Sequence, residues 1–275
     1  MSLPLRLDAV GIVGPGLPGW TESLPVLRGL RPHAFEPLPR PALDRLPARE
    51  RRRVTPTIAL ALAAAGEVPP ALLDPPPVAV FACSGGDTEV IDRICRALNL
   101  PDRPVSPANF HNSVHNAPAG YWSIALGAGV PMTSLSAYDA SLAAGFLEAA
   151  TGVLDDGGPR LLVAYDTPPP PPLWAHRPLV APFAVALLLG PGTNEPGTLA
   201  RLRLDLEEGP DETVMDDPSL ERLRAGNPAA RVLPLLALLA RGGAGSVALP
   251  YLKGGSLRIG LEPSAGLEPS ADLGA

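Results

Sequence analysis

Residues 133–148 read T-S-L-S-A-Y-D-A-S-L-A-A-G-F-L-E. The stretch opens with a short β-capable run, passes through a sharp turn of small residues and continues as an alanine-rich helical pattern. Tyr138 stands in the turn, and Asp139 and Ser141 fall in the first helical turn. The stretch therefore predicts a strand-to-helix elbow, the connection from which layered α/β folds are built.

The chain before the elbow alternates between strand and helix patterns. Residues 78–83 (V-A-V-F-A-C) form a continuous apolar run, as expected of a central strand. The polar residues 101–118 are expected to form a long loop. The alternation over the first 165 residues predicts a right-handed parallel α/β arrangement. The expected strands are 5–13, 78–83 and 161–166, and the expected helices are 20–28, a segment starting at 48, 88–98 and a segment ending near 126.

The chain after residue 166 is expected to complete the same domain. Residues 180–189 and 199–206 look like two strands paired with each other, and the five prolines 168–172 before them indicate a stiff connector. A helix over 229–240 and strands near 246–250 and 256–261 follow. Residues 1–262 are thus interpreted as one domain. Residues 263–275 lack apolar periodicity and are expected to be a disordered tail.

Composition excludes several classes of function. The net charge of −6 gives no field that would hold nucleic acid. The longest apolar stretches, 56–66 and 180–189, are too short to span a membrane. Two cysteines without C-x-x-C spacing and an N-terminus without a signal pattern favour a reducing cytoplasm. The basic cluster 49–53 is either a solvated helical turn or a docking point for an acidic partner such as a carrier protein.

Several polar groups are candidates for chemistry. His111 and His115 are four residues apart, but no third ligand with suitable spacing is visible and Pro118 disfavours a regular helix through both, so neither a metal nor a cofactor is predicted. Residues 84–86 (S-G-G) form either a tight turn or a small anion cradle. Cys83 is interpreted as a core residue. A hydrolytic triad through Ser141 and Asp139 is disfavoured, because Ser141 lies inside the helix rather than at the elbow.

Two motifs carry a family resemblance. They are S-P-A-N-F-H-N-S-V-H-N-A-P-A-G-Y-W-S-I-A-L-G at 106–127 and S-A-Y-D-A-S-L-A-A-G at 136–145. Both resemble the N-terminal half of β-ketoacyl synthases. More closely, they are similar to the short β-ketoacyl synthase-like proteins, often labelled chain-length factors, of aryl polyene and related fatty-acid-type gene clusters. The resemblance implies a thiolase-like, layered α/β/α half-fold with a mixed sheet.

The same resemblance assigns roles to residues. Alignment on Ser141 and Leu142 places the family's nucleophilic cysteine at Tyr138, whose phenol, with an ordinary pKa near ~10, cannot replace a thiolate. The family's two histidines of the second half have no counterpart, since no histidine follows His176. The segment 109–120 corresponds to a region near the dimer interface and the acyl tunnel. It supplies the expected substrate-binding residues Asn109, Phe110, Asn112, Ser113 and Asn116.

Two functions are compatible with these residues. The first is a catalytically degenerate partner that pairs with a ketosynthase, or with itself, and helps to shape the acyl tunnel or to dock acyl carrier protein. The second is an acyltransferase or thioesterase with His111 or His115 as the base and a hydroxyl of Ser113, Tyr138 or Ser141. A third possibility is an interaction module whose pocket has closed. Tyr138 is then a plug in the place of the acyl-cysteine, a packing residue, or a hydroxyl that binds a ligand.

Overall fold

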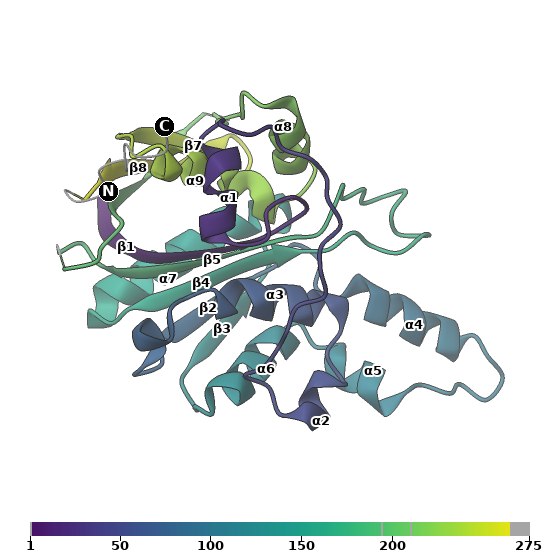
Figure 1. The fold of residues 1–275 in the computed structure, drawn as a ribbon. Helices are drawn as coiled ribbons and strands as arrows, with labels where there is room; N and C mark the ends of the chain where they lie inside the picture. The colour runs from purple at the N-terminus through teal and green to yellow at the C-terminus, as the bar shows by residue number, and fades with distance from the viewer. Residues whose placement is uncertain (1, 194, 210, 265–275) are drawn as a thin grey trace, which may run out of the picture.

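The protein, a computed structural model that describes residues 2–193, 195–209 and 211–264, is built on one eight-stranded mixed sheet (Figure 1). The strand order is β3-β2-β4-β5-β1-β6-β8-β7. Only the pairs β2–β3 and β2–β4 are parallel, and every other pair is antiparallel. The strands are β1 (Ser2–Val13), β2 (Val78–Ala82), β3 (Met132–Leu135), β4 (Arg160–Asp166), β5 (Phe183–Pro191), β6 (Ala200–Glu208), β7 (Gly245–Tyr251) and β8 (Gly255–Pro263).

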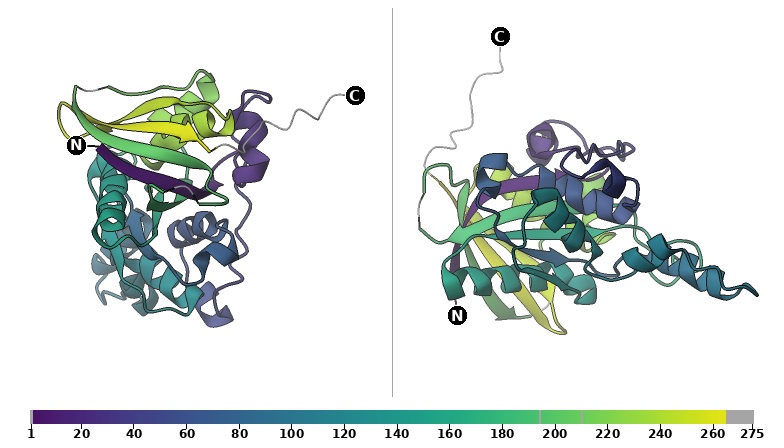
Figure 2. Two further views of the ribbon diagram at one scale, coloured as in Figure 1. Left: turned by 90° about the vertical axis from the view of Figure 1, so that its left-hand side faces the viewer. Right: turned by 90° about the horizontal axis from the view of Figure 1, so that it is seen from below.

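Helices cover both faces of the sheet, as Figures 1 and 2 show. The α-helices are α1 (Trp20–Leu27), α2 (Ala48–Arg51), α3 (Pro56–Gly66), α4 (Thr88–Leu98), α5 (Pro107–Asn112), α6 (Ala117–Leu126), α7 (Ser141–Asp156), α8 (Pro218–Ala225) and α9 (Leu233–Ala240). Short 3-10 turns lie at η1 (Pro70–Leu73), η2 (Tyr138–Ala140) and η3 (Ala229–Val232). Within the described part of the chain, no helix has the length and hydrophobicity needed to cross a membrane.

Two cores form because side chains alternate across each central strand. In β4, Leu162 and Ala164 join the core that contains α7 and α9. Their neighbours Leu161 and Val163 point the other way, into the core beneath α3 and α6. Every residue of β4 is buried. This explains why the strand reads as a continuous apolar run rather than as an alternating pattern.

The sequence prediction of a mixed, layered α/β fold is confirmed, but the predicted strand neighbours are partly wrong. Strand β1 does not join the parallel group, because it lies between β5 and β6 and is antiparallel to both. For the same reason the two strands expected at 180–189 and 199–206 do not pair with each other. The two strands expected near 246–250 and 256–261 are confirmed as β7 and β8, and the structure adds that they pair antiparallel with each other.

Two helix predictions also need correction. The helix expected to start at residue 48 is interrupted, because Thr55 takes an extended conformation and its Oγ1 accepts a hydrogen bond from the Ile58 N–H at 3.2 Å, capping α3. Pro56 then occupies the first helical position, where a missing N–H costs nothing. The loop expected over 101–118 contains the short helix α5, which starts at Pro107 for the same reason. Of the tail expected over 263–275, Pro263 is instead the last residue of β8, and residues 265–275 lie outside the described residues.

The parallel strands β2, β3 and β4 end at the same edge of the sheet. Helices α4 and α5 extend from this edge as an arm that projects away from the body of the molecule (Figures 1 and 2). The elbow between β3 and α7 lies at the same edge. Functional sites in α/β sheets gather at the carboxyl ends of the strands, so this edge is where the candidate residues are placed.

Candidate functional site

The elbow between β3 and α7 has a strained backbone. Tyr138 has a φ of 52°, in the left-handed region that non-glycine residues rarely occupy. Such a conformation costs about 1–2 kcal/mol and persists only where the surroundings impose it. The Tyr138 side chain is 60% exposed. The residue therefore stands at the exposed tip of a strained strand-to-helix corner.

Ser141 holds this corner in shape. The residue is buried, and its Oγ accepts a hydrogen bond from the Ala137 N–H at 2.9 Å. The Ser141 hydroxyl donates in turn to the Tyr138 carbonyl oxygen at 2.6 Å. The hydroxyl thus acts as both acceptor and donor to backbone groups of the elbow. This leaves Ser141 as a structural residue rather than an available nucleophile.

Two arginines from distant parts of the chain converge on the elbow. The Arg177 guanidinium carbon lies 3.9 Å from the centroid of the Tyr138 ring, in a cation–π contact. Arg177 also forms an ion pair with Asp139 at 2.5 Å. Arg231 donates to the Asp139 carbonyl oxygen at 2.7 Å, and its guanidinium lies 3.5 Å from the carboxylate. The sequence pattern did not indicate either contact, because Arg177 lies 39 positions from Tyr138 and Arg231 lies 92 positions from Asp139.

A buried polar cluster lies behind the elbow, at the ends of β2 and β4. Asp166 accepts hydrogen bonds from the Ser84 N–H at 2.8 Å and the Ser84 hydroxyl at 2.6 Å. Burial raises the pKa of Asp166 to about 6, although the hydrogen bonds from Ser84 oppose the rise. The cluster connects to the elbow through the Ser136 hydroxyl, which donates to the Ser84 carbonyl oxygen at 3.1 Å.

Cys83 belongs to the same cluster. Burial, followed by the nearby Asp166 charge, raises the pKa of its thiol well above the ordinary value, which makes it unreactive. Its Sγ donates to Asp166 at 3.4 Å and accepts from the Gly86 N–H at 3.1 Å. The N–H groups of Ser84 and Gly86 are therefore engaged inside the protein. This favours the tight-turn interpretation of residues 84–86 over an anion cradle.

His111 and His115 contact different parts of the protein. His115 packs on the turn at Gly86, where an added Cβ would meet the imidazole Cδ2 at 3.4 Å. The His115 Nε2 is buried and has no partner among the described residues. His111 contacts the edge of the Tyr121 ring, with the ring centroids 6.1 Å apart. The residues that the structure describes contain no group of three or more His, Cys, Asp or Glu side chains able to hold a metal ion.

No hydrogen bond in the described part of the chain joins either histidine to a candidate hydroxyl. The Ser113 hydroxyl donates to the Phe110 carbonyl oxygen at 2.8 Å. Tyr138 stacks on Arg177, and Ser141 is bonded to the backbone. A base and nucleophile must lie within hydrogen-bond reach to form an activated pair, and this chain alone does not bring one together.

The residues expected to bind substrate divide into two kinds. Asn112 is structural: it donates to the Arg53 carbonyl oxygen at 2.8 Å and accepts from the Tyr121 hydroxyl at 3.2 Å. Phe110 is 70% exposed, and the neighbouring Val114 is 54% exposed. Asn109 is half-buried on α5, and Asn116 is exposed at the start of α6. Phe110, Val114 and Asn116 therefore lie on the surface of this chain, whereas Asn112 is buried.

The family model described as "Beta-ketoacyl synthase, N-terminal domain" matches residues 29–229. No individually curated protein matches the chain.

Three solved structures share the fold. A chain of the ketosynthase (ApeO) in complex with its chain length factor (ApeC) from Xenorhabdus doucetiae has a TM-score of 0.71 and 22% identity, over 94% of this chain and 99% of that chain. A chain of the ishigamide ketosynthase/chain length factor has a TM-score of 0.68 and 15% identity, over 95% and 99%. A chain of AntDE:AntF, a type II PKS acyl-carrier protein in complex with its ketosynthase, has a TM-score of 0.70 and 14% identity, over 96% and 100%.

Proposed function

This chain belongs to the β-ketoacyl synthase, N-terminal domain family, and from that premise we propose that it is a ketosynthase-like subunit that does not itself carry the growing acyl chain. It acts instead by pairing with a ketosynthase, in the manner of a chain-length factor, in fatty-acid- or polyketide-type synthesis.

The observation that carries this proposal is the elbow. Its backbone keeps the strained left-handed conformation at Tyr138, at the corner where the family resemblance puts the nucleophilic cysteine. A phenol is a far poorer acyl acceptor than a thiolate at neutral pH. The Tyr138 ring is held against Arg177 instead of facing a base. The geometry of a nucleophile elbow without a thiolate supports a partner role rather than condensation by this chain.

An exposed apolar surface on the projecting arm supports a protein partner. Leu98 and Leu100, at the end of α4, are about half exposed, as is Val114, and Phe110 is more exposed still. Large apolar side chains gathered on one projection are typical of protein interfaces. Solved structures with this fold include complexes of ketosynthases with chain length factors and with an acyl-carrier protein, which agrees with this kind of assembly.

Strand β3 adds an open sheet edge beside the elbow. The carbonyl oxygens of Pro131 and Leu135 accept from N–H groups on the β2 side of the strand. Because main-chain groups alternate in direction along a strand, those of Met132 and Ser134 face away from β2. β3 ends the sheet, so these groups are available to a partner strand. The interface that we propose therefore combines the β3 edge with the arm.

Acyl carrier protein is the second partner that we propose. The cluster 49–53 lies on and just after α2, and its four arginines are exposed. Within the described part of the chain, Arg51 pairs with Asp44 at 3.2 Å and Arg53 with Glu50 at 3.7 Å, both at the surface. Such exposed pairs contribute little and exchange readily. The cluster therefore suits transient docking of an acidic protein.

The test is sedimentation velocity of the full chain mixed with a β-ketoacyl synthase from the same organism. We expect a 1:1 complex that Phe110→Asp weakens by roughly 30-fold, because a charge would be buried at the centre of the contact. Leu30→Asp is the matched control, since Leu30 is 77% exposed just after α1 and away from the arm. A chain that stays monomeric and binds neither the synthase, an acyl carrier protein nor itself would contradict the proposal.

An acyl-thioester-processing enzyme is the alternative. One observation favours it: the buried His115 Nε2 has no hydrogen-bond partner among the described residues, so it is free to accept a proton as a general base must. Hydrolysis or transfer of acyl groups from short- and long-chain acyl-CoA would then fall by orders of magnitude in His115→Ala. The absence of turnover by the wild-type chain would exclude this alternative and leave the partner role intact.

A further inference from the structure

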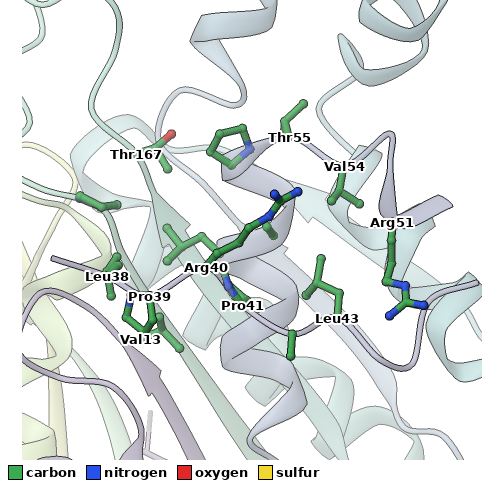
Figure 3. Close-up of a pocket in the computed structure, with 15 residues that line it drawn as sticks. Val13, Leu38, Pro39, Arg40, Pro41, Leu43, Arg51, Val54, Thr55 and Thr167 are labelled. Atoms are coloured by element: carbon green, nitrogen blue, oxygen red, sulfur yellow. The ribbon is translucent and has the colours of Figure 1, made fainter. Parts of the chain in front are cut away.

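A cavity of about 550 Å³ lies between the proline-rich segment 38–43 and the start of α3 (Figure 3). Its walls are largely apolar and include Val13, Leu38, Leu43, Val54 and Leu60. Its volume falls in the range of small-molecule sites, about 300–1,000 Å³. Neither Tyr138 nor either candidate histidine lines it, so it is distinct from the elbow.

The charged residues that line this cavity are all positive. Two arginines line it and no acidic residue does, among the described residues. Arg51 is paired with Asp44 at 3.2 Å. Arg40, in contrast, has no hydrogen-bond or ion-pair partner in the described part of the chain. In Figure 3 the Arg40 side chain crosses the cavity and its guanidinium points toward Thr55, the N-cap of α3.

The position of Arg40 favours an anion beside it. The N-terminal end of α3 carries the positive end of the helix dipole, so it adds to the positive potential rather than balancing it. A guanidinium presents a planar set of donors that matches a carboxylate or a phosphate. The apolar walls at the same time exclude a ligand that is polar throughout, because its polar groups would lose their hydration.

We propose that this cavity binds a straight-chain aliphatic anion. The chain packs against Leu38, Leu43 and Leu60, and the carboxylate or phosphate pairs with Arg40. A free fatty acid and a phosphorylated lipid both present this chemistry. The site is separate from the elbow and from the β3 edge, so its test does not depend on pairing with a ketosynthase, although Arg51 belongs both to its lining and to the cluster 49–53.

Isothermal titration calorimetry of the full chain with decanoate, decyl phosphate and 1-decanol tests the proposal. We expect saturable 1:1 binding of at least one anion and binding of 1-decanol that is at least ~10-fold weaker. Arg40→Gln should weaken the anion by about 10-fold or more and leave 1-decanol unchanged. Arg31→Gln, which removes an exposed arginine that neither lines the cavity nor belongs to the cluster 49–53, should change nothing. Tighter decanoate would identify a fatty acid, and tighter decyl phosphate a phosphorylated lipid.

A second variant tests the apolar part of the site. Ala59 lies on α3 and lines the cavity, so Ala59→Phe should fill it and abolish binding of all three ligands, with circular dichroism as the check on folding. Arg40 is exposed, so Arg40→Gln stays informative even if Ala59→Phe does not fold. The proposal is overturned if neither anion saturates, if Arg40→Gln binds as tightly as wild type, or if Arg31→Gln weakens binding equally.

Discussion

Replacing Tyr138 by alanine and by glycine separates the strain of the elbow from the contact of the ring. Alanine removes the cation–π contact with Arg177, worth about 0.5–1 kcal/mol at an exposed site, and keeps the strain at φ 52°. Glycine removes the same contact but relieves about 1–2 kcal/mol of backbone strain. The unfolded glycine chain gains about 0.4–1 kcal/mol of entropy in return. We therefore expect the glycine variant to be more stable than the alanine variant by about 0.5–1 kcal/mol.

Equilibrium urea unfolding followed by circular dichroism measures this difference, provided that the m-values agree. Ala144→Gly in the interior of α7 is the matched control, because there the same exchange should destabilise by about 1 kcal/mol. Changing alanine to glycine should therefore raise the free energy of unfolding at position 138 and lower it at position 144. If glycine is also the less stable residue at position 138, the elbow does not hold Tyr138 in a left-handed conformation and the likeness to a nucleophile elbow is lost.

Three further measurements follow from the buried groups at the elbow. Burial raises the folded-state pKa of Asp166 from its ordinary value of about 4 to about 6. Its contribution to the free energy of unfolding is therefore full below the ordinary value and is lost, by about 3 kcal/mol, as the pH rises through 6; urea unfolding between pH 4 and 7 should show most of this decline in wild type and none of it in Asp166→Asn. Ser141→Ala should cost about 2–3 kcal/mol, since the Ala137 N–H and the Tyr138 carbonyl lose their shared hydroxyl; a change below about 0.5 kcal/mol in urea unfolding would mean that the hydroxyl does not hold the elbow. Iodoacetamide should label the exposed Cys95 in the native protein and the buried Cys83 only after unfolding, as read by peptide mass spectrometry; native labelling of Cys83 would contradict its burial.

The elbow was the part of the fold that the sequence predicted best. A β-capable run, small residues and an alanine-rich pattern lie within one short stretch, so local interactions alone define β3 and α7. Helix α4 was equally clear, because Asp87 caps it through a hydrogen bond from the Val90 N–H at 3.1 Å.

Strand order could not be predicted in the same way. β1 and β5 are both apolar and of similar length, and nothing in either pattern indicates that β1 inserts between β5 and β6. Helix α8 was missed although Asp217 and Pro218 form a start signal, with the Asp217 carboxylate accepting from the N–H groups of Ser219 and Leu220. A polar helix of eight residues has too little apolar periodicity to stand out.

The roles of the arginines could not be predicted from the sequence for a different reason. Arg177 and Arg231 reach Asp139 only once β4, β5 and η3 are packed together, so their role depends on tertiary structure rather than on local pattern. Arg40 is similar, because its significance comes from the absence of a counter-charge around a cavity that the folded chain creates.

Intact-protein mass spectrometry addresses the central claim most directly. The full chain, a β-ketoacyl synthase from the same organism and an acylated carrier protein are combined, and the mass of each chain is recorded together with the native mass of the assembly. Our account predicts a 1:1 complex in which the acyl mass is found on the synthase and never on the chain that carries Tyr138. Acylation of this chain, or full acyl loading with no complex between the two, would contradict it.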